Sequence, residues 1–215
     1  MVKSGKRTGK SERPFRDAEV TQQQILDAAE EEFSRHGLNG ARMIAIAGGA
    51  KVTTATLHYY FESKENLYKA VLQRLVDEVK VIIEQQNFDD LSPSEALKEI
   101  IRIAITNEAK NPHGQMLWFQ EASQNQGKYF QECKVASLHQ HLLKVLERGM
   151  ETGCFRPMKP FLALTHILSV CLFYFTVHEN WKHLTPDVNR LSRDMIEQHI
   201  EEATTFILAG VIKVT

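Results

Sequence analysis

Hydroxyl, imidazole and phenol side chains gather in one short segment, residues 53–59, which reads Thr-Thr-Ala-Thr-Leu-His-Tyr. These groups hydrogen-bond well, but they do not form a nucleophile beside a positioned base, so the chemistry they favour is recognition. On a helix, short hydroxyls and aromatic tips fit a DNA major groove about 12 Å wide, where a threonine can hydrogen-bond a base edge or contact a thymine methyl. A surface for a partner of another kind is the alternative.

The chain carries no Gly-x-Ser-x-Gly, His-Glu-x-x-His or phosphate-loop motif, which argues against an enzyme. His139 and His141 are two residues apart and His178 and His183 are five apart, so neither pair has the spacing of metal ligands on one helix face. The three cysteines contain no Cys-x-x-Cys pair and indicate a reducing compartment. We therefore expect no enzyme, no cofactor, no metal site and a cytoplasmic location.

Positive charge is concentrated at the start of the chain. Residues 1–16 hold six basic residues and one glutamate, whereas the whole chain has a net charge of −1. A basic arm on an acidic body suits contact with nucleic acid, and a solubilising disordered tail explains the same composition. The segment lacks the apolar core of a secretory signal, so we expect no export.

Helical periodicity runs through almost all of the chain from Val20 onward, and no alternating apolar run is long enough for a sheet. The expected fold class is therefore all-α. Thr21 is the expected N-cap of the first helix, which ends at Gly37.

Further helix signals follow. The segment Ser92-Pro93-Ser94-Glu95 has the form of a capping box with proline in the first turn. Apolar residues at three- and four-residue steps predict a long amphipathic helix from about residue 64 to 85. Later helices are expected near 95–110, 113–124, 129–152, 160–180 and 193–212.

Two short helices around a tight turn are expected between Ala41 and Phe61. Small residues at 47–50 let these helices approach closely, and Leu57 with Phe61 anchors the second helix. Thr53 is a good N-cap for that helix. The arrangement is that of a helix-turn-helix, which reads a major groove with its second helix, although the same geometry also occurs as plain packing.

In three stretches of the chain, small, hydroxyl, aromatic and Lys-Glu residues occur in the same order as in one known protein family. They are ILDAA with Phe33 and Gly37, then Met43 with the Ile46-Ala47 pair, and TTATLHYYFESKENLY ending at Tyr68. In these positions the run of residues 21–72 resembles the N-terminal domain of the TetR family of transcriptional regulators.

The resemblance implies that residues 53–59 form the recognition helix. Residues 54–56 would then lie nearest the bases, and His58 and Tyr59 would contact phosphates. Lys64 matches a phosphate-contacting lysine, at a helix start that favours anions. The predicted DNA-binding residues are Arg42, Lys51, Thr53, Thr54, Ala55, Thr56, His58, Tyr59 and Lys64.

Three residues depart from the family pattern. Ala41 stands where a capping threonine is common, so the second helix loses a side-chain cap worth about 1 kcal/mol. Lys51 replaces the usual turn glycine and is strained if that position needs a positive φ. His58 replaces a common tyrosine, which makes one phosphate contact sensitive to pH.

The resemblance implies that the remaining helices form a ligand-sensing and dimerising domain. Residues 161–177 are apolar on nearly every face, and their length of seventeen residues is below the ~20 that a membrane span needs. Burial by the protein's own domain and by a second subunit explains this helix better than a membrane does, and with residues 195–211 it would form a four-helix dimer interface. The expected domains are a basic disordered arm (1–18), a helix-turn-helix DNA-binding domain (19–65) and a ligand-sensing and dimerisation domain (66–215).

Aromatic and polar residues of the later helices are candidates for a small-molecule pocket. The segment around Asn66-Leu67-Tyr68 and the aromatic-rich helix after residue 160 also resemble the pyrimidine-sensing branch of the family. The predicted ligand-binding residues are Trp118, Glu121, His166, Phe173, Tyr174 and Trp181, with Phe119 and Gln124 as further candidates.

These patterns together predict a ligand-responsive DNA-binding regulator. We expect a homodimeric repressor that binds double-stranded, palindromic operator DNA, is released by a small-molecule effector and has no membrane segment. A helical adaptor that binds only protein is the competing interpretation.

Overall fold

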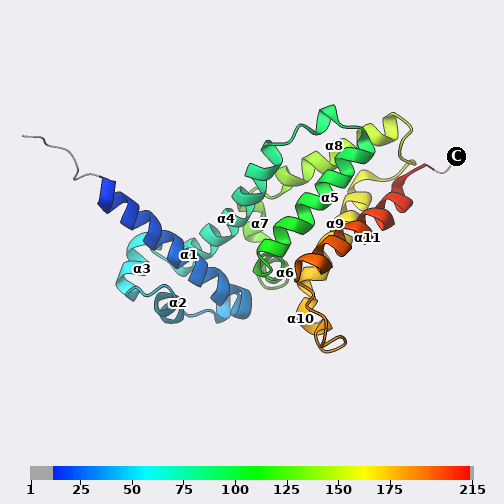
Figure 1. The fold of residues 1–215 in the computed structure, drawn as a ribbon. Coiled ribbons are helices and arrows are strands. Elements are labelled where there is room, and N and C mark those ends of the chain that lie inside the picture. Colours follow the sequence, from blue (N-terminus) through cyan, green and yellow to red (C-terminus); the bar gives the residue numbers. More distant parts are fainter. Residues whose placement is uncertain (1–11, 214–215) are drawn as a thin grey trace, which may run out of the picture. The chain divides into compact units, whose positions relative to one another are not determined.

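The structure, a computed structural model, describes residues 12–213 and, within that range, all side chains except those of residues 12–17, 137 and 138. The described residues form α-helices without a strand, apart from one isolated bridge between Phe155 and Ile212. The all-α prediction is confirmed. In chain order, the elements drawn in Figure 1 are α1 (Glu12–Gly40), α2 (Met43–Gly49), α3 (Thr54–Phe61), α4 (Lys64–Glu84), the short 3-10 helix η1 (Phe88–Asp90), α5 (Pro93–Lys110), α6 (His113–Asn125), α7 (Lys128–Glu132), α8 (Ala136–Glu151), α9 (Pro160–Thr176), α10 (His178–Trp181) and α11 (Arg193–Val211).

The chain divides into two compact units, unit 1 (Met1–Val71) and unit 2 (Leu72–Thr215). The division falls within α4, so it lies later in the chain than the predicted boundary between residues 65 and 66. Helix α4 is continuous across it.

The start of α1 differs from expectation. Residues 1–11 of the predicted basic arm (1–18) lie outside the described residues. The rest of the arm, residues 12–18, belongs to α1. Pro14 falls in the first turn, where a proline interrupts no helical hydrogen bond. Because α1 runs through Thr21 without a break, the predicted N-cap there is wrong. Gly37 does end the first helical stretch, since its φ of 66° and ψ of 178° leave the helical region.

Unit 1 is held together by an apolar core between α1 and the helices that follow. Phe33 and Tyr68 are fully buried, with their rings edge to face and their centroids 5.0 Å apart. Ile46 of α2 and Leu57 of α3 are also fully buried. The small residues of α2 are expected to let it approach α3, but the close contact at Gly49 is with α1, where an added Cβ would lie 3.2 Å from the Cβ of Ala28. The core thus fixes the two short helices against α1.

Unit 2 has its core among α5, α8, α9 and α11, and α5 contacts all three of the others. The capping box of α5 is confirmed, because the Ser92 side chain accepts from Glu95 N and the Glu95 carboxylate accepts from Ser92 N at 3.1 Å. At the end of α8, the ring of buried Phe155 packs directly on Gly149. An added Cβ at Gly149 would lie 2.0 Å from that ring, so only glycine fits there.

The single helix expected over 129–152 is wrong. The segment forms α7 and α8, which are separated by residues 133–135. Lys134 has a φ of 56°, a left-handed conformation that an α-helix cannot accommodate. Helical periodicity continues across this interruption, which is why the sequence pattern did not reveal it.

Helix α9 is buried along one side only. Ala163, Ile167 and Phe175 lie in the core, whereas Phe161 and Phe173 are more than half exposed. No helix within residues 12–213 is long and apolar enough to cross a membrane.

Candidate nucleic-acid interface and cavity

The turn between α2 and α3 closes as a Schellman motif. Lys51 N donates to Gly48 O at 3.1 Å and Val52 N donates to Ala47 O at 3.0 Å, which satisfies the last carbonyls of α2. The motif requires a left-handed residue directly after the helix cap, and Lys51 occupies that position with a φ of 56°. The predicted strain at Lys51 is therefore present.

Thr53 caps α3 as predicted. Its Oγ1 accepts from Thr56 N at 3.0 Å, and the two threonine hydroxyl oxygens lie 2.8 Å apart. The cap holds α3 at a defined start, and it also engages the Thr56 hydroxyl. The half-buried Thr56 side chain is consequently less available for a base edge than the prediction assumes.

The exposed face of α3 lies opposite its buried anchors, Leu57 and Phe61. At the helical spacing of 3.6 residues, Ala55 and Tyr59 point directly away from those anchors. Tyr59 is 83% exposed, an unusual exposure for a large aromatic side chain. Thr54 is exposed as well. This face has the hydroxyl and aromatic groups expected of a helix that enters a major groove.

His58 lies at the side of this face and is oriented by the backbone. Its Nδ1 is 3.0 Å from the carbonyl oxygen of Glu62, so Nδ1–H donates to that oxygen in the neutral ring. The neutral Nε2 is then an acceptor and cannot donate to a phosphate. The phosphate contact predicted for His58 stays a prediction.

The predicted cap position of α2 is corrected by one residue. Arg42, not Ala41, is the N-cap, and it has no side-chain cap, as expected. Arg42 N donates to Glu32 Oε1 at 3.0 Å, so a carboxylate of α1 holds the backbone of the N-cap residue itself, not the N–H groups of the first helical turn that a capping threonine would bind. The Arg42 side chain is exposed. Ala41 is buried in the core of unit 1.

Lys64, the predicted phosphate-binding lysine, makes two internal contacts. Its Nζ donates to Asn39 O and to Ala41 O, each at 3.2 Å. The ammonium group has three N–H donors, so these bonds leave one for another acceptor. In this structure Lys64 joins the start of α4 to the segment between α1 and α2, and its phosphate contact stays a prediction.

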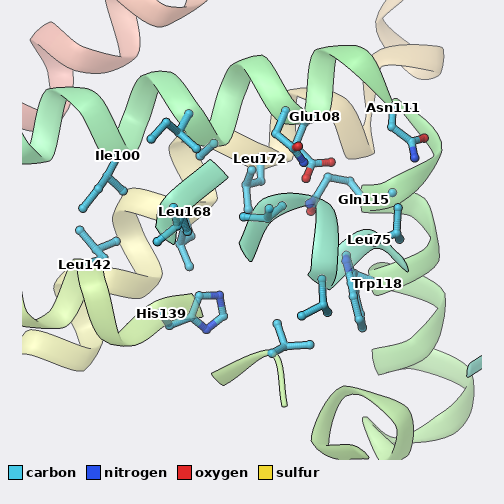
Figure 2. Close-up of a pocket in the computed structure, with 18 of the residues that line it drawn as sticks. Leu75, Ile100, Glu108, Asn111, Gln115, Trp118, His139, Leu142, Leu168 and Leu172 are labelled. Atoms are coloured by element: carbon cyan, nitrogen blue, oxygen red, sulfur yellow. The ribbon is translucent and has the colours of Figure 1, made fainter. Parts of the chain in front are cut away.

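Unit 2 contains a cavity of about 280 Å³. Its walls come from α4, α5, α6, α7, α8 and α9, and most of the lining side chains are aliphatic (Figure 2). Polar residues gather where α5 ends and α6 begins, and Figure 2 shows Glu108, Asn111 and Gln115 there, with His139 toward the other side. An apolar cavity with a few convergent polar groups is the usual form of a small-molecule site.

The structure brings only one of the six predicted ligand-binding residues into this cavity, namely Trp118. His166 lines a separate hollow beside α11, and Phe173 is 59% exposed. Tyr174 donates its hydroxyl to Arg190 O at 2.7 Å and stacks on a histidine of α11. Trp181 is exposed on α10. The additional candidates, Phe119 and Gln124, are exposed on α6 and do not line the cavity.

Glu121 has a structural role that explains its deep burial. Its carboxylate accepts from Tyr129 N and from Asn125 Nδ2, both at 2.7 Å, and its side chain is 1% exposed. These bonds tie the start of α7 to the end of α6. The carboxylate is therefore committed to the fold and does not face the cavity.

Sequence reasoning did not identify as ligand-binding candidates the polar residues that line the cavity, which are Asn107, Glu108, Asn111, Gln115, His139 and His141. One signal was present: Asn107, Asn111 and Gln115 recur at four-residue steps. This signal does not show that the residues face a space, because that depends on how six helices pack.

An apolar face outside the cavity joins α9 and α11, which contact each other. Phe161, Leu162 and Phe206 are 71%, 48% and 68% exposed, and a hollow lined by residues of both helices lies on this face. Large exposed apolar patches are typical of surfaces that interact with another molecule.

Comparison with known proteins agrees with this architecture. Residues 25–71 match the family described as bacterial regulatory proteins, tetR family, and residues 93–206 match the tetracyclin repressor-like C-terminal domain. The crystal structure of HlyIIR, a hemolysin II transcriptional regulator, has a TM-score of 0.61 and 26% identity, and the match covers 87% of this chain and 98% of that one.

Two curated relatives are also similar. The HTH-type transcriptional regulator RutR of Escherichia coli K12 is 35% identical over 116 residues, which is 54% of this chain and 53% of that protein. The match thus spans about half of the length of RutR. The HTH-type transcriptional repressor NicS of Pseudomonas putida is 28% identical over 166 residues, or 73% of this chain and 76% of that protein.

Proposed function

Because the chain belongs to the TetR family of bacterial regulatory proteins, we propose that it is a repressor that binds operator DNA and is released from it by a small molecule. The observation that carries the proposal is the capped, exposed α3, which presents Ala55 and Tyr59 away from a rigid core. The relative NicS is named a transcriptional repressor, which supports repression over activation. Such a protein acts where the operator lies, in the cytoplasm.

A second copy of the chain is the partner that fits the α9–α11 face. Two such faces would form a four-helix interface, and burial of Phe161 and Phe206 would remove large apolar surfaces from water. A two-fold dimer presents two recognition helices to half-sites about 34 to 36 Å apart, which matches a palindromic operator.

The cavity is the proposed effector site, and α4 is the element that couples it to DNA. Leu75, Val79 and Ile83 of α4 line the cavity, and the same continuous helix begins in unit 1 directly after α3. An effector that prefers one position of α4 would shift the population of DNA-binding conformations. The pyrimidine effector suggested by resemblance stays a prediction.

Fluorescence anisotropy with a labelled duplex from the protein's own upstream region tests DNA binding. We expect salt-dependent binding of the wild type, and at least about a tenfold loss in a variant carrying Thr54→Ala and Tyr59→Ala. Gln22→Ala, on the exposed side of α1, is the matched control and should bind as the wild type does. Absence of wild-type binding at low salt contradicts the proposal, and an unaffected double variant favours the protein-binding adaptor.

Analytical ultracentrifugation tests the dimer. Phe206→Asp places a charge on the α9–α11 face and should yield monomers. Phe119→Asp makes the same change at an exposed phenylalanine of α6 and should leave the dimer intact. Equal sedimentation of the two variants would show that another surface joins the subunits.

A further inference from the structure

The cavity of unit 2 has an apolar body. Val79, Ile100, Leu142 and Leu168 come from four different helices and are representative of its walls. A ligand that fills this part gains from burying hydrocarbon surface, and these aliphatic walls offer no hydrogen bond to a polar atom, although the imidazoles of His139 and His141 also line the cavity. The body of the ligand must therefore be apolar.

One end of the cavity is polar. Asn107, Asn111 and Gln115 bring three carboxamides to the corner between α5 and α6. Asn111 Oδ1 accepts from His113 N at 3.3 Å, while the half-buried amides of Asn107 and Gln115 make no hydrogen bond within the described residues. A carboxamide both donates and accepts, so these two side chains can pair with a ligand group that also does both.

The charges around the cavity oppose an anion. Neither lysine nor arginine is among the residues that line it, and Glu108 adds a carboxylate at the polar end. Burial lowers the pKa of His139 below its usual 6.5, so this imidazole is neutral at neutral pH. His141 lines the cavity as well, but an anionic head group would still lose its hydration here without meeting a lysine or an arginine, which is costly.

We propose that the effector is an uncharged molecule with an apolar body and one amide-type edge, a carboxamide or lactam, which pairs with the side-chain amides of Asn107 and Gln115. The inference rests on the proposed function in one respect, that the cavity is the effector site. It adds the chemical class of the ligand and the two residues that determine its specificity. A pyrimidine base has such an amide-type edge but lacks the apolar body, so it meets only one of the two requirements.

Isothermal titration calorimetry of the full chain at pH 7 tests the class with probes that share one apolar body. We expect naphthylacetamide to bind at least about 30-fold more tightly than naphthylacetate, because the anion meets neither a lysine nor an arginine. Naphthylethylamine should also bind more weakly than the amide, and so should uracil, which has the edge without the apolar body. Equal or tighter binding of any of the three, or no binding of the amide, overturns the inference.

Substitution of Gln115 locates the edge. Gln115→Leu should weaken naphthylacetamide binding about tenfold, whereas Gln115→Arg should reverse the preference in favour of naphthylacetate. Asn107→Leu provides a second variant if the first folds poorly, as judged by circular dichroism. Gln124→Arg, an exposed change on the same helix, is the control and should alter neither affinity. Unchanged amide binding in both leucine variants overturns the assignment of the edge.

These measurements need no DNA. If the proposed function fails, the duplex does not bind, while the order of probe affinities can still hold. If the inference fails, the order of affinities is lost, while DNA binding by the wild type is unaffected. The two failures are therefore distinguishable.

Discussion

Lys51 combines two properties that a single substitution can separate. Its backbone holds the left-handed position of the Schellman motif between α2 and α3, and its exposed side chain carries a positive charge next to the recognition helix. Lys51→Gly removes both the Cβ and the charge. It should raise the stability of the fold and lower the affinity for DNA.

The gain in stability follows from the backbone conformation. A left-handed conformation costs an L-residue about 1–2 kcal/mol, and glycine loses about 0.5–1 kcal/mol more backbone entropy on folding. The difference is a stabilisation of about 0.5–1 kcal/mol, because the two Schellman hydrogen bonds are made by backbone atoms and remain. For a chain of this size the thermal midpoint should rise by roughly 1–4 °C.

The loss of DNA binding follows from the charge. Each phosphate contact contributes about 0.9 to the slope of log affinity against log salt concentration. A dimer has two copies of Lys51, so the magnitude of that slope should fall by about 1.8. The assays are thermal unfolding by circular dichroism and anisotropy titrations at several salt concentrations.

Two matched variants separate the effects. Lys51→Ala removes the charge but keeps a Cβ at positive φ, so it should lower the salt slope without raising the thermal midpoint. Lys51→Arg keeps the charge and the strain, and should leave both values as in the wild type. A thermal midpoint that does not rise in Lys51→Gly would refute the strain argument, and an unchanged salt slope would refute the phosphate contact.

Three other predictions concern stability. Thr53→Ala removes the cap of α3 and should cost about 1 kcal/mol in urea unfolding. Gly149→Ala gains up to about 1 kcal/mol of helix propensity but meets the buried ring of Phe155, and overpacking of about 1–3 kcal/mol should prevail. His199 is packed against a tyrosine ring, and burial lowers its pKa more than its contact with a backbone carbonyl raises it. The unfolded chain therefore binds a proton there first, so stability should fall as pH drops below 6.5, and His199→Gln should reduce that pH dependence.

Each of these has a control and a contradicting result. Thr53→Ser keeps the capping oxygen and should unfold as the wild type does; equal loss in both variants argues against the cap. Gly149→Ala with Phe155→Leu should recover part of the stability, and a stabilised single variant would show that the ring moves aside. For the histidine, a wild-type stability that is flat between pH 7 and 5 would contradict the sign of the effect.

Local structure was determined by short stretches of sequence. Periodicity placed most helices, and hydrogen-bonding side chains such as Thr53 and Ser92 determined where α3 and α5 begin, because a cap joins atoms only three residues apart. The left-handed conformation at Lys51 was anticipated only as a condition, from the glycine that is usual at this position in the family that the chain resembles. The caps need no distant partner, so residue order alone is enough to predict them.

The cavity was decided by tertiary structure. Glu121 and Tyr174 are of residue types that are common in binding sites, but the packing of the chain gives each a backbone partner. The Glu121 carboxylate accepts from Tyr129 N, and the Tyr174 hydroxyl donates to Arg190 O. Gln115, on the same helix as Glu121, lines the cavity because α6 turns that side toward α4 and α5. Which side of a helix faces a space depends on how helices from distant parts of the chain cross, and no local pattern of residues encodes that crossing.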